Sequence, residues 1–154
     1  MPTPTTPIIL EVWDAIKTQI EDDYSSGYSG LDLTGRVFQG RFIEAPLVGS
    51  AYVVFVDQTE QNGAVLTRYQ GQLRFQIFCF NYGQNNYERT ANAIKLGADV
   101  HNSLIADRTL ALSAGRIDNI IVSTAALDGD EFGMNQLGIS LIEVQVAFQS
   151  DRGI

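Results

Sequence analysis

The sequence predicts an α+β fold: a mostly antiparallel, curled β-sheet of four to five strands with two helices packed on one face. Two stretches, residues 8–23 and about 86–105, repeat apolar residues at the spacing of an amphipathic helix. Between them lie β-branched and aromatic runs separated by Asn62-Gly63, a pair typical of a hairpin turn. Hairpin-linked strands favour antiparallel pairing, and two helices are too few to cover both faces of such a sheet.

The first helix is expected to follow a Pro- and Thr-rich segment, residues 1–7, which should form a flexible tail. Thr6 is suited to cap this helix because its hydroxyl can accept a bond from a backbone N–H. Pro7 suits the first helical position, where the N–H that it lacks would have no partner. The predicted apolar stripe comprises Ile9, Val12, Trp13, Ile16 and Ile20.

The second helix should begin at a cap formed by Asn85 or Asn86. Its expected buried side comprises Ala91, Ala93, Ile94, Gly97, Ala98, Val100, Leu104 and Ile105. The Gly- and Ser-rich residues 24–35 predict a loop, longer than the ~4–6 residues usual in a compact domain. We expect a loop of that length to be either mobile or functional.

Strands are expected over residues 36–43, 51–57, 65–81, 116–127 and 137–149. In the third of these, alternation places Leu73, Phe75, Ile77 and Cys79 on one face and Arg74, Gln76, Phe78 and Phe80 on the other. In the last strand the apolar alternation changes face between Leu141 and Ile142. Such a change indicates either a β-bulge or a strand that is covered on both faces.

Composition argues against several classes of protein. A chain of 154 residues, 45% of them hydrophobic, can bury one ordinary core, and no linker divides it, so residues 1–154 are expected to form a single domain. The formal net charge of -8 disfavours a protein that grips nucleic acid phosphates or docks on an anionic membrane. No apolar run reaches the ~20 residues that cross a bilayer, and the start, Met1 to Pro4, lacks the basic residues of a signal peptide.

Few side chains are available for catalysis. The chain has one histidine, His101, and one cysteine, Cys79, and it carries no HExxH, Walker or GxSxG motif. Its acidic residues 128–136 lack the alternating oxygen ligands of a calcium loop. The sequence therefore predicts a protein that is not an enzyme, with no catalytic, cofactor-binding or metal-binding residues.

Apolar residues are in surplus on the predicted sheet. Phe78, Phe80 and part of the series Val144, Val146 and Phe148 are expected on the face opposite the helices. Exposing several such side chains to water is unfavourable by ~1.5–3 kcal/mol each. Either the sheet curls to cover them, or neighbouring subunits do, in which case these five residues form an interface.

The order of elements resembles the tail terminator, or tail completion, proteins of long-tailed bacteriophages. An N-terminal helix, a Gly-rich loop and a Pro-containing turn at Glu44-Ala45-Pro46 precede a long hairpin that ends in a Phe-rich strand, residues 73–80. A helix containing Ala-Asn-Ala-Ile94 and a closing pair of strands complete the resemblance.

This resemblance implies a structural protein of the virion that is assembled in the host cytoplasm. It would form a ring, commonly of six copies, that caps the head-proximal end of the tail tube and joins it to a head connector or stopper protein. DNA would pass through the ring transiently and without sequence preference, and no membrane would be involved. Three loops, residues 24–35, 57–64 and 128–136, would serve as clamps that order on docking.

Carboxylates that face a channel would repel DNA phosphates and let the DNA slide. We therefore expect one of two acidic groups to line or rim that channel: either Asp14, Glu21 and Asp22, or Asp128, Asp130 and Glu131. The alternative for either group is a solvated surface that aids solubility.

Other functions stay open at this stage. Another neck component or a tail tube subunit would share the same size and order of elements. A small enzyme or ligand-binding domain could use the mouth of the curled sheet, with Arg74, Gln76 and Glu143 as convergent polar groups. A host adaptor that dimerises through its sheet is a further possibility.

Overall fold

The computed structural model describes residues 7–22, 27–40, 48–62, 69–112, 117–127 and 137–150. Within these ranges the chain forms two helices and five strands. In chain order they are α1 (Ile8–Asp22), β1 (Val37–Gln39), β2 (Ser50–Asn62), β3 (Tyr69–Tyr82), α2 (Asn86–Ala106), β4 (Ile117–Leu127) and β5 (Leu137–Ser150). Thr6, the expected cap, and Gly63 of the expected hairpin turn lie outside the described residues.

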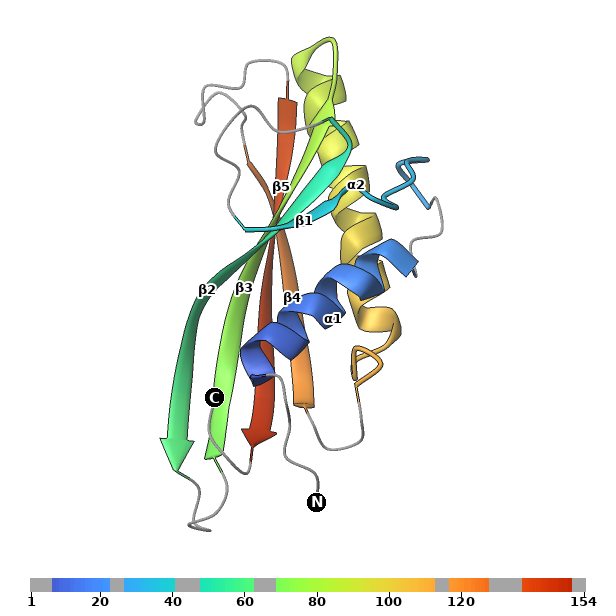
Figure 1. Ribbon diagram of the computed structural model, residues 1–154. Helices are drawn as coiled ribbons and strands as arrows, with labels where there is room; N and C mark the ends of the chain where they lie inside the picture. Colours follow the sequence, from blue (N-terminus) through green and yellow to red (C-terminus); the bar gives the residue numbers. More distant parts are fainter. Residues whose placement is uncertain are drawn as a thin grey trace.

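The five strands form one open sheet in the order β1-β2-β3-β5-β4 (Figure 1). Three of its four pairings, β2 with β3, β3 with β5 and β5 with β4, are antiparallel, whereas the short β1 pairs in parallel with β2. The predicted α+β fold with a mostly antiparallel sheet is therefore confirmed, and β1 makes the sheet mixed.

Both helices cover the same face of the sheet. The apolar side chains of α1 and α2 meet one another and the strands in a single core, because each helix turns one stripe of residues inward. From α1 the fully buried residues include Val12, Ile16 and Ile20, as predicted. Asn85 caps α2 by accepting a bond from the backbone N–H of Glu88 at 2.9 Å, also as predicted.

The inward stripe of α2 differs from the predicted one. Ala93, Leu96, Val100 and Leu104 are buried, whereas Ile94 is 51% exposed and Ile105 is 36% exposed. Gly97 explains why a different side of the helix faces the sheet, because a Cβ added there would lie 2.7 Å from both Cβ and Oγ of Ser140 on β5. The small residue lets the helix approach the sheet closely, and that approach turns Ile94 and Ile105 outward.

The register of β5 against β3 runs without a break from Leu137 to Ser150. β5 therefore has no bulge against β3, and it is covered on both faces near Ile139 and Ile142, which are fully buried, whereas Glu143 is exposed. Bulges occur instead in β2, between Phe55 and Asp57, and in β4, between Ile117 and Asn119.

The described part of the long loop, residues 27–35, is anchored to α2. The carboxylate of the buried Asp99 accepts bonds from the backbone N–H groups of Tyr28 and Ser29, each at 2.8 Å. Leu33 is fully buried in the core between these bonds and β1. Another expected clamp, residues 57–64, is corrected in part, because residues 57–62 belong to β2.

Candidate assembly surface

The face of the sheet that carries no helix has its side chains arranged in rows. Residues paired across an antiparallel ladder point to the same face, so the register defines these rows directly. The rows run across the strands, and we call this surface the outer face. We call the end at which β3 turns into α2, at the top of Figure 1, the upper end.

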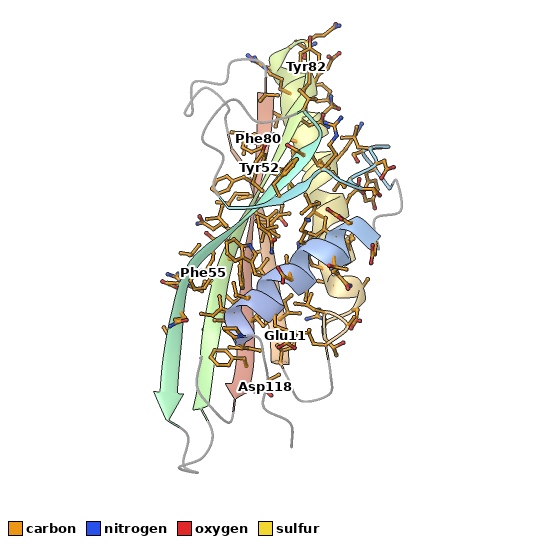
Figure 2. The ribbon with its side chains drawn as sticks, viewed as in Figure 1. Glu11, Tyr52, Phe55, Phe80, Tyr82 and Asp118 are labelled. Atoms are coloured by element: carbon orange, nitrogen blue, oxygen red, sulfur yellow. The ribbon has the colours of Figure 1, made fainter. Side chains whose placement is uncertain are left out.

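The upper rows of the outer face are apolar. One row crosses all five strands and consists of Phe38, Tyr52, Phe78, Leu141 and Ala125. The rings of Phe38 and Tyr52 stack with centroids 5.1 Å apart, and Tyr52 meets Phe80 of the next row edge-on at 5.7 Å. Figure 2 shows Tyr52 and Phe80 together in the upper half of the molecule. Four residues of this row are half-buried and Ala125 is exposed.

The lower rows of the outer face are polar. One contains Asp57, Arg74, Gln145 and Ile121, and its neighbours contain Gln72, Gln76, Glu143, Ser123 and Asn119. Arg74 binds Asp57 through two nitrogens, with Nε 2.6 Å from Oδ1. This pairing holds the pKa of Asp57 below its usual range. Both side chains are well exposed, so solvent screens the pair.

The structure brings together Arg74, Gln76 and Glu143, the polar groups of the ligand-binding alternative. They line a hollow of about 30 Å³ beside Val56 and Gln145. A single water molecule occupies about 30 Å³ in the liquid, whereas small-molecule pockets measure ~300–1,000 Å³. The hollow is therefore far smaller than an ordinary small-molecule pocket.

The predicted position of three interface residues is wrong. Val144, Val146 and Phe148 pair with Phe75, Leu73 and Gly71 of β3, so they point toward the helices. All three are at most 1% exposed and belong to the core. Alternation alone could not assign the face, because β5 carries apolar residues on both sides.

Phe78 and Phe80 do lie on the outer face, as predicted. Phe80 is nevertheless fully buried within a single copy of the chain, so no second subunit is needed to cover it. Phe78 is half-buried. The most exposed large apolar residues of the outer face are instead Ile121, at 56%, and Tyr82, at 42%.

The acidic residues of α1 are placed at its surface. Asp14 is exposed and accepts a bond from Nε2 of Gln39 at 2.7 Å, Asp22 is exposed, and Glu21 is half-buried with the Nζ of Lys17 at 3.9 Å. The other acidic group, Asp128, Asp130 and Glu131, lies outside the described residues.

Both edges of the sheet leave backbone groups available for a further strand within the described part of the chain. β4 is the last described strand on one side and pairs with β5, and its Ile120 carbonyl accepts a bond from the Arg108 guanidinium at 3.3 Å. On the other side β1 pairs with Ala51–Val53, and no other described strand lies beside the remainder of β2 on that edge. Unpaired edges bind further strands readily, which makes them natural contact points between copies.

A shallow groove, which no sequence pattern indicated, lies between α2 and β4. It measures about 390 Å³ and is lined by Ile94, Ala98, His101, Asn102, Thr124 and Ser140. His101 bonds through Nδ1 to Oγ1 of Thr124 at 2.8 Å. The outward rotation of Ile94 forms this groove, and periodicity could not predict that rotation.

The described residues show little that suits catalysis. Burial raises the pKa of the Cys79 thiol well above its usual value, so this side chain is an unreactive part of the core. Among the described residues, no three His, Cys, Asp or Glu side chains cluster as metal ligands. Neither described helix has the length and apolarity needed to cross a membrane.

Comparison with known proteins gives a similarity of structure. No family model matches the chain, and no curated protein matches its sequence. Among the solved structures, the fold is similar to that of a chain from the virion of a native gene transfer agent particle, with a TM-score of 0.57 and 16% sequence identity. The match covers 90% of this chain and 95% of that chain, so the two share the whole fold rather than one motif.

Proposed function

We propose that this chain is a structural, non-enzymatic component of a phage-like virion. The observation that carries the proposal is the shared fold with a chain of a gene transfer agent virion over 90% of this chain and 95% of that one. The order of elements, which resembles the tail terminator family, supports the same class independently of that comparison.

Within that class, we propose a ring that caps the head-proximal end of the tail tube and joins it to the head connector or stopper. Six copies of the 16.9 kDa chain, about 101 kDa, would form this homohexameric ring. DNA would pass through its channel without sequence-specific contact, and the protein would reside at the neck of the virion after assembly in the host cytoplasm.

The two open sheet edges suit a ring because they are different surfaces on opposite sides of one chain. A head-to-tail contact closes into a ring when the rotation between copies is right. β2 and β4 run in opposite directions, since three antiparallel pairings separate them in the sheet. If the ring axis lies along the strands, the β4 edge of one copy meets the β2 edge of the next in antiparallel orientation.

Light scattering and electron microscopy test the ring, first on the purified protein and then on the protein mixed with purified tail tubes. A mass of about 101 kDa with closed rings supports the terminator, whereas open-ended growth supports a tube subunit. A dimer favours an adaptor. A chain that stays monomeric and binds neither tubes nor connectors contradicts the proposal.

A substitution on the β4 edge tests whether copies of the chain pair through their sheet edges. Ile121→Lys places a charge on the exposed β4 edge strand and should abolish ring formation, because lysine on an edge strand opposes further pairing. Leu10→Lys is a control that adds the same charge at an exposed position, since Leu10 is 45% exposed and lies on α1 rather than on an edge strand. Equal loss of rings in both variants would contradict pairing through the edges.

The acidic channel remains part of this proposal. Carboxylates of one of two groups, either Asp128, Asp130 and Glu131 or Asp14, Glu21 and Asp22, would keep DNA from adhering to the ring. Reversing charge with Asp128→Lys and Glu131→Lys should impair genome passage while particles still assemble. Normal infectivity of that variant would contradict the proposal that this acidic group lines the channel.

A further inference from the structure

The edge of β4 that faces away from β5 carries outward backbone groups at every second residue. In an antiparallel ladder the N–H and C=O of one residue point to the same side, and the side alternates along the strand. On β2 the groups of Ala51 and Val53 point toward β1, where they bond to Arg36 and Gly40. The registers carry this alternation across the sheet and leave these residues of β4 pointing outward: Ile120, Val122, Thr124 and Ala126.

A turn at the lower end of α2 in Figure 1 covers the lower part of this edge. We call this turn, residues 107–112, the edge turn. Its Arg108 donates from Nη1 to the outward carbonyl of Ile120 at 3.3 Å. Beside Ile120 the register of β4 breaks between Ile117 and Asn119. Charged side chains and β-bulges are two means by which proteins keep an edge strand from pairing, and both occur here.

The contacts of the edge turn hold its backbone in place. Leu110 is 2% exposed and belongs to the core, and the carboxylate of Asp107 accepts the N–H groups of Thr109 at 3.0 Å and Ala111 at 3.1 Å. Leu110 and Ala111 have φ angles of 53° and 57°, in the left-handed region that residues other than glycine rarely adopt. Such strain persists only where the surrounding contacts enforce it, and it is concentrated at functional sites.

The upper part of the β4 edge has neither protective feature within the described residues. Its register is regular from Asn119 to Leu127, and residues 120–127 contain no charged side chain. On the helix side this part borders the groove between α2 and β4, to which Thr124 belongs. A strand that adds to a sheet edge gains affinity from backbone bonds and specificity from pockets for its side chains. The β4 edge is therefore closed at Ile120 and open above it.

We propose that the edge turn is a stop that confines strand pairing on the β4 edge to the residues above Ile120. Pairing along a uniform edge can slip, because the backbone bonds repeat at every second residue. A stop at one end removes the registers that extend past it, and a ring closes only when every contact has the same rotation.

The partner is the edge strand of a second copy, so this inference rests on the proposed function and adds where along β4 the contact lies. The same chain supplies a suitable strand, because no described strand lies beside β2 beyond Val53 on the edge where β1 pairs. The β4 edge and the β2 edge are different surfaces, so the contact does not block its own repetition around a ring.

Hydrogen exchange before and after self-assembly, alone or on purified tail tubes, tests the stop. In the wild type we expect assembly to slow exchange at the outward amides of Val122, Thr124 and Ala126, while the amide of Ile120 is unchanged. The slowing should be about fivefold or more, the equivalent of one hydrogen bond of ~1 kcal/mol. In Arg108→Ala the amide of Ile120 should be slowed as well, because nothing then occupies its end of the edge.

Arg89→Ala is the matched control, because it removes the same charge and a bond within the chain, to Oδ1 of Asn86, at the other end of α2. It should keep the wild-type exchange pattern and the wild-type ring mass. Arg108→Ala should instead give a mixture of masses by light scattering. Since Arg108 is exposed, its variant should keep a thermal midpoint close to that of the wild type.

The outcomes separate this inference from the proposed function. Slowed exchange at Ile120 in the wild-type assembly, or a wild-type pattern in Arg108→Ala, overturns the stop and leaves the ring intact. Slowed exchange at Val122, Thr124 and Ala126 in a complex that holds one copy of this chain and a different protein overturns the second copy as the partner. A wild-type chain that never self-associates overturns the proposed ring and the stop together.

Discussion

The same strands form both faces of the sheet, yet the side chains of the two faces differ in how far they are exposed to solvent. On the helix side, residues such as Phe75, Ile77, Val144 and Val146 are at most 1% exposed and are sealed within one chain. The outer face instead changes along the strands, from apolar rows at the upper end to polar rows below. The comparison teaches that most of the core lies on the helix side, whereas the outer face is buried only in its upper rows, at Phe80 and Ile139.

The largest expected effect of a substitution is therefore on the helix side. Phe148→Ala removes a ring that is 1% exposed in the core, and we expect the free energy of unfolding to fall by about 3–5 kcal/mol. Phe78→Ala on the outer face is the matched control, because that ring is only half-buried. Urea denaturation measures both variants. Equal losses would remove the distinction between the faces.

Close packing of α2 on β5 gives the next effect. Gly97→Ala places a Cβ 2.7 Å from the Cβ of Ser140, and the helix must shift, so we expect a loss of about 1–3 kcal/mol in the free energy of unfolding. Adding Ser140→Gly should restore part of that loss. No restoration in the double variant would place the strain elsewhere. Thermal denaturation of the wild type, Gly97→Ala and the double variant makes this comparison.

The anchor of the long loop should have a comparable or smaller effect. Asp99→Ala removes the carboxylate that accepts the N–H groups of Tyr28 and Ser29, at an expected loss of about 1.5–3 kcal/mol. Hydrogen exchange should then rise at residues 28 and 29. Asp14→Ala, which removes one exposed contact with Gln39, is the control and should leave exchange at residues 28 and 29 unaffected. Unchanged protection in Asp99→Ala would refute the anchor.

The smallest effect belongs to the ion pair of the outer face. The pKa of Asp57 is lowered by its hydrogen bond to Arg74, so the pair stabilises the fold above the unfolded-state pKa of about 3.9 and loses this contribution as the pH falls through the lower, folded-state pKa. The stability of wild type and Asp57→Asn should therefore differ slightly at neutral pH and converge in acid. A difference that grows in acid would contradict this sign.

Much of the fold could be predicted because its elements follow local patterns. The cap at Asn85, both helices and the alternation of Leu73 with Arg74 were readable from spacing and residue type. The face of the sheet on which Val144 lies could not be predicted, because β5 is apolar on both sides and periodicity does not say which side carries the helices. The same limit applies to Ile94, since the position of α2 depends on the contact between Gly97 and Ser140.

The candidate surface was less predictable than the fold. Phe78 and Phe80 were placed on the correct face, but their exposure depends on neighbours that are distant in the sequence. The outward position of Ile94, which lines the groove between α2 and β4, was not predicted either, because helical periodicity assigned it to the buried side.

The close seating of Gly97 against Ser140 has a mechanical consequence. A helix of 21 residues extends for about 30 Å, and here it cannot slide along the sheet without forcing backbone into a side chain. A force applied at either end of α2, near Asn86 or near Ala106, would therefore move the helix and the sheet together.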